Sequence, residues 1–337
     1  MRNWARIPKK IAYRLKIASN DAFFALGWRK TRGILSLPGQ RILVYHGLDE
    51  RGEKSLNGRF LSVSRFEAQV RFLSENAQVI SLDDYFAGRF DPQRFAVALT
   101  FDDGYRNNLT YALPVLEKYG VPATFFLTSA SGRGAEWLWM DFLDVATRLA
   151  PATLTVGDRR FVKKRWQHTR YFADEQGRKL VDWARYAPWS FIQVMEAALQ
   201  AAGAWNGAAD WATYWQLLSP PEIRELASHP LATIGAHGHT HQDLAHLPPE
   251  AAIHELRQCR EILENITSSP VRALAYPFGT YTRALVDAAA QMGFSQQLAV
   301  DFLFPEDPSD PRLRSRTCIN PFVSDENQWL AIRNGRF

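Results

Sequence analysis

Runs of apolar residues alternate along most of the chain with amphipathic stretches of helical spacing. A short apolar run bounded by polar turns predicts a buried strand, whereas apolar residues three and four apart predict a helix with one buried face. Seven runs fit a strand: 41–46, 78–81, 95–101, 121–127, 231–236, 271–276 and 294–300. The helical stretches include 64–76, 107–119, 220–228 and 249–265. This alternation predicts parallel strands with crossover helices in a barrel-like α/β fold.

Local signals mark where two of these helices begin and end. Ser64 and Glu67 have the spacing of a capping box, so we expect Ser64 to be the N-cap of the first helix. Gly120 directly follows the stretch 107–119, and a glycine in this position commonly ends a helix.

Residues 131–218 interrupt the alternation and contain eight of the eleven tryptophans. Helical patterns at 139–149 and 190–202 predict a helical insertion. Two interpretations of the tryptophans stay open. They form the core of the insertion, or some of their rings line a sugar-binding cleft, because aromatic faces pack against the C–H faces of sugars.

Residues 1–39 form a separate basic segment, with a helix expected between Pro8 and Gly27. Apolar residues recur there at helical spacing: Ile7, Ile11, Leu15, Ala18 and Ala22. Residues 1–32 hold nine Lys or Arg and one acid, Asp21. The helix is expected either to pack on the domain or to lie on an anionic membrane surface.

Composition excludes several classes of protein. The chain has 337 residues, 46% of them hydrophobic and 22% charged, which is typical of a globular protein and not of a disordered one. Two cysteines, Cys259 and Cys318, cannot form a disulfide framework or a cysteine zinc site. The net charge is +5 and residues 1–32 contribute +8, so the remainder is about −3 by subtraction. A body without basic excess argues against nucleic-acid binding.

The basic segment does not have the pattern of a secretory signal. Charged and polar residues interrupt the apolar positions between Lys10 and Arg29, and no run approaches the ~18 apolar residues of a membrane span. We therefore expect a cytoplasmic protein, with peripheral contact at the inner membrane face through residues 1–32 as an additional expectation.

Adjacent carboxylates end one of the buried strands, in the stretch Thr100–Tyr105. Asp102 and Asp103 directly follow the apolar run 95–101, and Gly104 permits a tight turn there. The carboxyl ends of parallel strands are where such sheets place their sites. An aspartate at a strand-to-helix turn is also a common helix cap, so the pair alone does not identify a site.

Three of the eight histidines fall within five residues after the strand 231–236. His237 and His241 are four residues apart, which in a helical turn places both imidazoles on one side. His239 would then point elsewhere. Two imidazoles with one carboxylate suit zinc, iron, cobalt, nickel or manganese and leave positions for water and substrate.

Together these motifs resemble the polysaccharide deacetylases, also called carbohydrate esterase family 4 or the NodB homology domain. Thr100–Gly104 matches the family motif Thr-Phe-Asp-Asp-Gly, and His237 and His241 match its His-Ser/Thr-x-x-His. Ala275–Gly279 resembles its Arg-x-Pro-x-Gly. The resemblance covers about residues 40–130 and 219–320. It implies a distorted (β/α)7 barrel formed by residues 40–130 and 219–325, with residues 131–218 as the insertion.

The resemblance also implies roles for individual residues. Asp102 resembles the general base, while Asp103, His237 and His241 resemble the ligands of a divalent metal ion, most often zinc. The backbone N–H of Tyr276 resembles the donor to the oxyanion. Substrate contacts are expected from the rest of that motif: Pro277, Phe278 and Gly279.

Three features depart from the family pattern, and the first is Gly238, which stands in place of the hydroxyl residue of the histidine motif. Ala275 replaces an arginine that steadies the base, and the candidates for its replacement are Arg272, Arg314 and Arg316. No histidine follows His254, so the family's late general-acid histidine is missing. His46, at the end of the first predicted strand, is our candidate for the general acid, with a packed structural histidine as the alternative.

The sequence therefore predicts a metal-dependent N-deacetylase that acts on an N-acetylated sugar in surface-polysaccharide or exopolysaccharide synthesis. A first alternative is a superfamily relative that hydrolyses another C–N amide, such as a cyclic imide or ureide. A second is a non-catalytic glycan-binding protein of the same fold, against which the base Asp102 argues.

Overall fold

A computed structural model describes residues 6–27, 31, 33–54, 57–130, 136–166 and 169–335. Its larger lobe is built on a nine-stranded parallel sheet, in the order β13-β12-β11-β10-β6-β5-β1-β14 with β4 against β5. The strands are β1 (Gly39–Tyr45), β4 (Gln78–Ile80), β5 (Phe95–Phe101), β6 (Ala123–Leu127), β10 (Ala232–Ala236), β11 (Ala273–Ala275), β12 (Gln296–Ala299), β13 (Leu313–Ser315) and β14 (Thr317–Cys318). All seven predicted strands are confirmed, and β13 and β14 are additional.

The two edges of this sheet are adjacent in sequence, which makes it a nearly closed barrel. β13 pairs with β12 at one edge, while β14 pairs with β1 at the other. Only Arg316 separates the two strands. Because the chain crosses from one edge to the other at this residue, Arg316 lies where the barrel closes.

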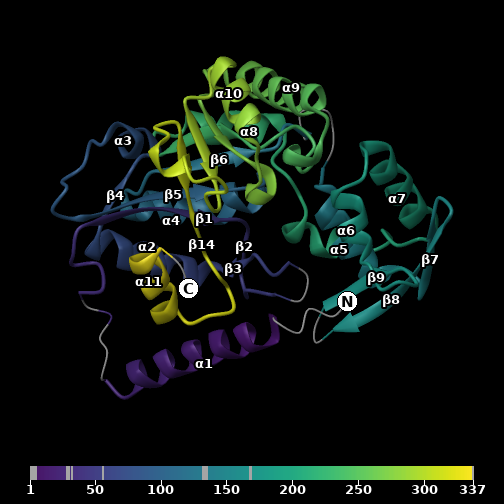
Figure 1. The fold of residues 1–337 in the computed structure, drawn as a ribbon, viewed down its shortest axis with the longest axis horizontal. Helices are drawn as coiled ribbons and strands as arrows, with labels where there is room; N and C mark the ends of the chain where they lie inside the picture. The colour runs from purple at the N-terminus through teal and green to yellow at the C-terminus, as the bar shows by residue number, and fades with distance from the viewer. Residues whose placement is uncertain are drawn as a thin grey trace.

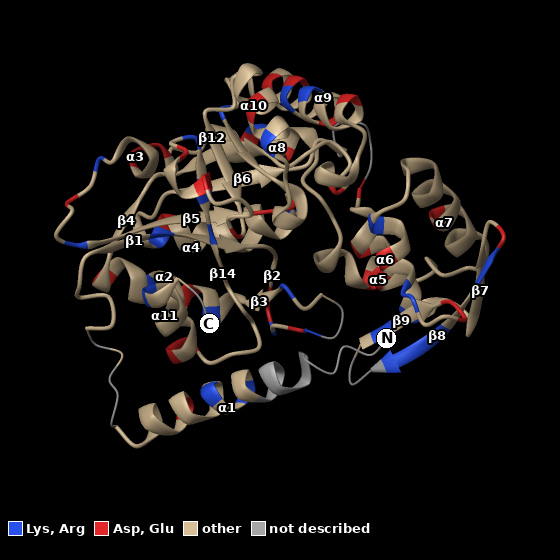
Figure 2. Ribbon diagram, in the orientation of Figure 1, with Lys and Arg blue, Asp and Glu red and all other residues tan. Residues whose placement is uncertain are grey.

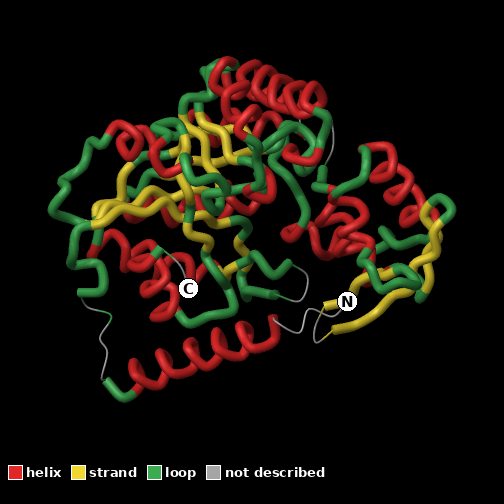
Figure 3. The backbone as a smooth tube through the Cα atoms, viewed as in Figure 1, coloured by secondary structure: helices red, strands yellow, loops and turns green. Residues whose placement is uncertain are grey.

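Helices surround the strands of the larger lobe (Figure 3). They are α2 (Val63–Asn76), α3 (Leu82–Ala87), α4 (Leu113–Tyr119), α8 (Pro220–Ser228), α9 (Pro249–Thr267), α10 (Arg283–Gln291) and α11 (Asp325–Asn334). A π-helical turn, Asn108–Ala112, precedes α4, and the short strands β2 (Leu48–Asp49) and β3 (Leu61–Ser62) pair beside the barrel. The helices predicted over 64–76, 107–119, 220–228 and 249–265 are thus confirmed within a few residues.

The helix signals are correct at one site and wrong at the other. Gly120 ends α4 in the left-handed conformation, with φ 63°, as expected. The N-cap of α2 is Ser62, whose side chain accepts a hydrogen bond from the N–H of Arg65, and not Ser64. Ser62 ends β3 in an extended conformation, so Ser64 already lies inside the helix.

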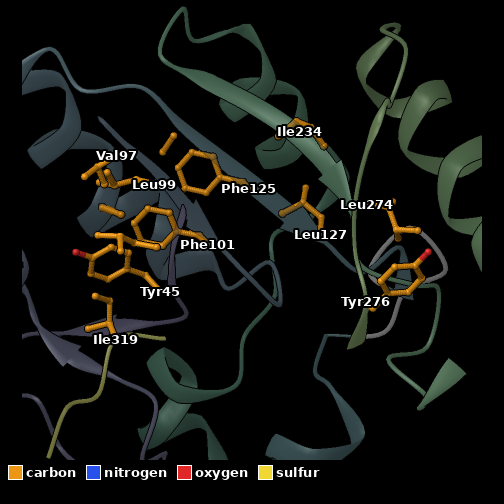
Figure 4. Close-up of a cluster of buried hydrophobic side chains, with 14 of the residues drawn as sticks. Tyr45, Val97, Leu99, Phe101, Phe125, Leu127, Ile234, Leu274, Tyr276 and Ile319 are labelled. Carbon is orange, nitrogen blue, oxygen red and sulfur yellow. The ribbon is translucent and has the colours of Figure 1, made fainter. Parts of the chain in front are cut away.

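Aromatic and branched side chains of adjacent strands fill the barrel core (Figure 4). The ring of Phe101 on β5 packs 5.4 Å from Tyr45 on β1 and 5.0 Å from Phe125 on β6, measured between ring centroids. All seven residues of β5 are buried. The strand ends that follow these packed layers therefore have fixed positions, as a site needs.

Residues 136–218 form a smaller lobe beside the barrel (Figure 1). Its elements are α5 (Trp139–Leu149), β7 (Thr153–Val156), β8 (Arg159–Trp166), β9 (Thr169–Ala173), α6 (Leu180–Arg185), α7 (Trp189–Ala201) and a 3₁₀ segment, Ala208–Tyr214. The predicted helices at 139–149 and 190–202 are present. The description of the insertion as helical is incomplete, however, because β7–β8–β9 form an antiparallel sheet.

A hairpin signal in the sequence accounts for that sheet. In β7 the residues alternate between exposed and buried, with Leu154 and Val156 inside. Gly157, with φ 59°, and Asp158 then connect β7 to β8. Alternation followed by Gly-Asp is a typical hairpin pattern, so this element was readable from the sequence.

Most of the insertion's described tryptophans serve as packing residues. Trp139 and Trp215 are buried, and Trp137 and Trp205 pack against Trp215 with centroids 5.9 and 5.2 Å away. The side chain of Trp166 lies outside the described residues. These contacts favour the core interpretation for the cluster.

The basic segment forms helix α1 (Arg6–Ala25), which packs on α11. The Nδ2 of Asn20 donates to the Oδ1 of Asn327 over 2.8 Å, and Asn20 is buried. The side chains of Ile7 and Ile11 lie outside the described residues. Among the described helices, none combines the length and apolar character that a membrane crossing requires.

Candidate metal centre

The two sequence motifs meet at the carboxyl ends of neighbouring barrel strands. Asp102 and Asp103 follow β5, while His237 and His241 follow β10, and β6 lies between these strands. The N–H of Asp102 still donates to the carbonyl of Tyr45 on β1 over 3.0 Å. The backbone then turns sharply, with φ 80° at Asp103 and 82° at Gly104.

Asp103, His237 and His241 form a compact buried cluster of metal-ligand type, with one ligand atom from each within 4.8 Å of the others. The Oδ1 of Asp103 lies 3.5 Å from the Nε2 of His237 and 3.2 Å from the Nε2 of His241. Both carboxylate oxygens of Asp103 are buried without a hydrogen-bond partner of good geometry. A buried carboxylate with unsatisfied oxygens next to two imidazole nitrogens fits a divalent cation.

The backbone presents both imidazoles to that point, though not in the predicted manner. The ring nitrogen Nδ1 of His237 lies 2.7 Å from the carbonyl oxygen of Ala275, and a hydrogen bond there leaves Nε2 as the free ligand atom. The stretch from His237 to His241 is a bend and not the helical turn that we expected. His241 has a left-handed φ of 58°. This backbone conformation, and not a helical turn, brings its ring to the cluster.

His239 lies outside the cluster, as its position between the two ligands suggested. Its Nδ1 is 2.7 Å from the hydroxyl oxygen of Ser129. The carboxylate of Glu255 on α9 accepts hydrogen bonds from the N–H groups of His239 and Thr240, over 3.0 and 2.8 Å. Glu255 thus fixes the bend between the two ligand histidines, a role that no sequence motif indicated.

Arg316 replaces the arginine that is missing at Ala275. Its Nη1 and Nη2 donate to the two carboxylate oxygens of Asp102, each over 2.7 Å. Burial by itself would raise the pKa of Asp102, but the charge and hydrogen bonds of Arg316 and the nearby His237 hold this pKa below its usual value. Asp102 is therefore ionised and fixed in orientation beside the ligand cluster.

The role expected for the backbone N–H of Tyr276 is wrong. This N–H donates to the carbonyl of Leu298 on β12 over 3.0 Å, so it is part of the sheet and cannot face an oxyanion. Pro277 has no N–H, and Gly279 donates to the carbonyl of Tyr276. On this short loop, the remaining candidate donor to an oxyanion is therefore the N–H of Phe278.

The residues expected to contact substrate differ in exposure. Pro277 and Gly279 are buried, whereas Phe278 is partly exposed and adopts the left-handed φ of 61°. Its ring centroid lies 5.0 Å from that of His241 and 4.2 Å from the guanidinium carbon of Arg185 on α6. Phe278 therefore forms a wall next to a candidate metal ligand.

His46 lies near the charged groups of the site but is poorly suited to donate a proton. Burial lowers its pKa to about 4, although Asp103 and Asp102 act in the opposite direction. A neutral imidazole predominates near neutral pH, whereas a general acid must hold a transferable proton at the working pH. The structure thus places His46 near the site and weakens its assignment as the acid.

Arg59 is a site residue that the motifs did not reveal. Its Nη1 lies 3.2 Å from the Oδ2 of Asp103, and its Nη2 lies 2.8 Å from Asp141 on α5. Burial would raise the pKa of Asp103, but the charge of Arg59 and the two imidazoles hold it well below its usual range. The hydroxyl of Tyr105 also donates to Asp141, over 2.8 Å.

The insertion also contacts the loop that carries His241. The indole N–H of Trp139 donates to the carbonyl of His241 over 3.2 Å. Arg185 donates through Nε to the buried Asp243 over 2.8 Å, and the hydroxyl of Thr280 donates to the same carboxylate over 2.5 Å. Elements of both lobes therefore hold the loops that form the site.

Comparison with known proteins gives consistent matches. A profile of the polysaccharide deacetylase family matches residues 90–157 and 189–296. The putative polysaccharide deacetylase YxkH of Bacillus subtilis (strain 168) is 32% identical over 128 residues, which are 37% of this chain and 42% of that protein. The aligned part thus spans about two fifths of the curated relative.

Solved structures show the same fold at low sequence identity. The Streptococcus pyogenes deacetylase PplD, solved with acetate, has 16% identity and a TM-score of 0.56, and the match covers 88% of this chain and 99% of that one. IcaB from Ammonifex degensii has 17% identity and a TM-score of 0.52, with 88% and 96% covered. The predicted barrel type is thereby confirmed.

Proposed function

The chain belongs to the polysaccharide deacetylase family, and we propose on this basis that it is a metal-dependent hydrolase that removes N-acetyl groups from an N-acetylated sugar of surface-polysaccharide or exopolysaccharide synthesis. The relatives named above support the reaction class. One observation of this chain carries the proposal: an ionised Asp102, held by Arg316, lies beside a buried cluster of one carboxylate and two imidazoles. Binding alone would not require a fixed base at this place.

The ligands Asp103, His237 and His241 would hold the metal, and we propose zinc because two imidazole nitrogens and one carboxylate oxygen suit it. When bound, a divalent ion supplies Lewis acidity that polarises the acetyl carbonyl and acidifies water. The Oδ2 of Asp102 lies 3.8 Å from the Nε2 of His237, which supports Asp102 as a base next to the proposed metal position.

Asp102 accepts the proton of the attacking water in this proposal, and the N–H of Phe278 donates to the oxygen that becomes negative. After the transfer, the carboxyl group of Asp102 holds that proton. Because Arg316 keeps the pKa of Asp102 below its usual value, the protonated carboxyl gives up this proton readily and can return it to the leaving nitrogen. A separate general acid is then not required, which agrees with a neutral His46.

The test measures acetate release from a panel of N-acetylated glycans, with and without a chelator. We expect release that the chelator abolishes and that added zinc restores. The same panel includes cyclic imides and ureides, and hydrolysis of these with no acetate release would replace the proposal by another amidohydrolase function. Tight glycan binding with no product from any substrate would favour a non-catalytic protein.

A further inference from the structure

The only acidic residue of helix α1, Asp21, faces helix α11 of the barrel lobe. The Oδ1 of Asp21 accepts hydrogen bonds from the hydroxyl of Ser324 and the Nδ2 of Asn327, each over 2.6 Å. Asn20 is bound to Asn327 as well, and the Nδ2 of that residue reaches the carbonyl of Ile17 over 3.3 Å. These hydrogen bonds to α11 and its N-cap Ser324 hold Asp21 on the inner face of α1 and fix that face against the barrel.

The opposite face of α1 exposes large apolar side chains. Leu15 is 65% exposed and Leu26 is 62% exposed. Leu26 directly follows the last residue of α1, and its N–H donates to the carbonyl of Ala22 over 2.9 Å, so it continues the helical path. The two leucines are eleven residues apart, and a helix turns about 100° per residue, so they lie about 20° apart around the axis. Ala18 and Ala22 are exposed between them. This face therefore carries an exposed apolar stripe with the hydroxyl of Ser19 beside it, and we call this stripe the outer stripe (Leu15, Ala18, Ala22 and Leu26).

Basic residues flank the outer stripe on both sides. Arg14 and Lys16 are exposed and lie about 100° to either side of Leu15. The same helix also includes Arg6, Lys9 and Lys10 in its sequence. Figure 2 shows the basic residues described along α1. An apolar stripe between cations is the pattern of a helix that lies in a lipid interface.

Further exposed apolar side chains lie on segments outside α1. Among described residues, Phe322 at 66% and Leu37 at 59% are, with Leu15 and Leu26, the most exposed large hydrophobic side chains. Asn320, two residues before Phe322, donates to the hydroxyl of Tyr13 on α1 over 3.4 Å. The ammonium of Lys54 lies 5.2 Å from the Phe322 ring centroid. Apolar and basic groups thus recur together beyond the helix.

We propose that the outer stripe of α1 docks on an anionic lipid surface, with its leucines in the headgroup region and Arg14 and Lys16 on the lipid phosphates. The positive sequence of α1 and the inward position of Asp21 favour an anionic surface over an uncharged partner. The proposal does not depend on the deacetylase function, since it rests on α1 and its neighbours alone.

The test is sedimentation of the full chain with vesicles of phosphatidylcholine, or of phosphatidylcholine with phosphatidylglycerol. We expect binding only to the anionic vesicles, and weaker binding at higher salt. The double variant Leu15→Glu/Leu26→Glu should bind at least about tenfold more weakly, because it places two acids in the interface. The control Val194→Glu/Leu303→Glu carries the same charge change at positions that are 46% and 48% exposed. We expect it to bind the anionic vesicles more tightly than Leu15→Glu/Leu26→Glu does.

Further measurements make the outcome decisive. The variant Arg14→Ala/Lys16→Ala should lose about fivefold in affinity per residue and leaves the apolar stripe intact, so it serves if the leucine variant does not fold. Equal binding to both kinds of vesicle, or full binding by the leucine variant, would overturn the proposal. So would a wild-type dimer that Leu15→Glu/Leu26→Glu dissociates in sedimentation equilibrium, because the stripe would then face a second copy.

Discussion

Asp102 and Asp103 are adjacent in sequence but have different surroundings. Asp102 is bound at both oxygens by Arg316, whereas Asp103 has an oxygen next to both ligand imidazoles. We expect Asp102→Asn to reduce kcat/KM by about 10²–10⁴ and to keep the metal, because the lost group is the base. Asp103→Asn should lose the metal itself. Kinetics and elemental analysis of the dialysed proteins measure the two effects.

The pair of variants also tests the division of roles. Equal loss of metal from Asp102→Asn and Asp103→Asn would show that both carboxylates are ligands. A matched control is Asp83→Asn, an aspartate in the first turn of α3, away from the ligand motifs, which should change neither measurement.

Arg316 controls the protonation of Asp102. In Arg316→Met the buried carboxylate loses its cationic partner, so the pKa of Asp102 rises and the acid limb of the kcat/KM profile moves to higher pH. In the wild type this pKa is lowered, so the stability that the ion pair contributes is present above the unfolded-state pKa and is lost as pH falls through the folded-state pKa.

The variant should accordingly be less stable at neutral pH, by about 3–5 kcal/mol, since it leaves an uncompensated buried charge. Its deficit should shrink on acidification, because protonation of Asp102 removes that charge. Urea unfolding at several pH values measures this trend. Arg314→Met is the control, because the Nη1 of Arg314 bonds only to the backbone carbonyls of Asp310 and Leu313 in the contacts described, and its acid limb should not move.

At the scale of elements, the turn after β5 depends on Gly104. Its φ is 82°, and a Cβ there would lie 3.2 Å from the Cδ2 of Leu127 on β6. We expect Gly104→Ala to destabilise the protein by about 1–3 kcal/mol and to weaken metal binding, because the turn carries Asp103. Urea unfolding and metal titration measure both quantities.

Gly88 offers a matched comparison. It also has a positive φ, 65°, at the end of α3, but a Cβ there meets no atom within 4 Å. Gly88→Ala should therefore cost only the backbone strain and leave metal affinity unchanged. The same metal affinity in Gly104→Ala as in the wild type would contradict a role of this turn in placing Asp103.

The insertion acts on the site through single side chains of separate elements. Trp139 on α5 binds the carbonyl of His241, and Arg185 on α6 binds Asp243 in the same loop. Since Tyr105 in the loop after β5 donates to Asp141 on α5, both loops that carry the candidate ligands contact the smaller lobe. The lobe is thus part of the site's framework, although its tryptophan cluster is mainly core.

For the whole molecule, the buried cluster predicts strong coupling between metal binding and stability. Both oxygens of Asp103 are buried and have no hydrogen-bond partner of good geometry, although Arg59 lies 3.2 Å from Oδ2. Zinc at about 100 times its Kd should raise the free energy of unfolding by about 2.7 kcal/mol if it does not bind the unfolded chain. Thermal melts with zinc and with a chelator measure the shift, and Asp103→Asn should show none. A zinc-dependent shift retained by that variant would place the ion elsewhere.

The sequence determined the order of the elements and the cluster residues. The seven apolar runs could be predicted as strands because burial of a strand leaves a local pattern of apolar residues in the sequence. The motif residues Asp103, His237 and His241 converge because strand ends of one parallel sheet meet at one edge, a property that follows from the fold class. Sequence could also have predicted the β7–β8 hairpin from its alternation and Gly-Asp turn.

Only the tertiary structure decided the partners that depend on closure and register. Arg316 was one of three candidate arginines, and it reaches Asp102 because the chain crosses from one sheet edge to the other at that residue. The N–H of Tyr276 donates to the carbonyl of Leu298 because β11 pairs with β12. Such contacts join residues far apart in the chain, so no local spacing encodes them. The packed barrel sets their distances.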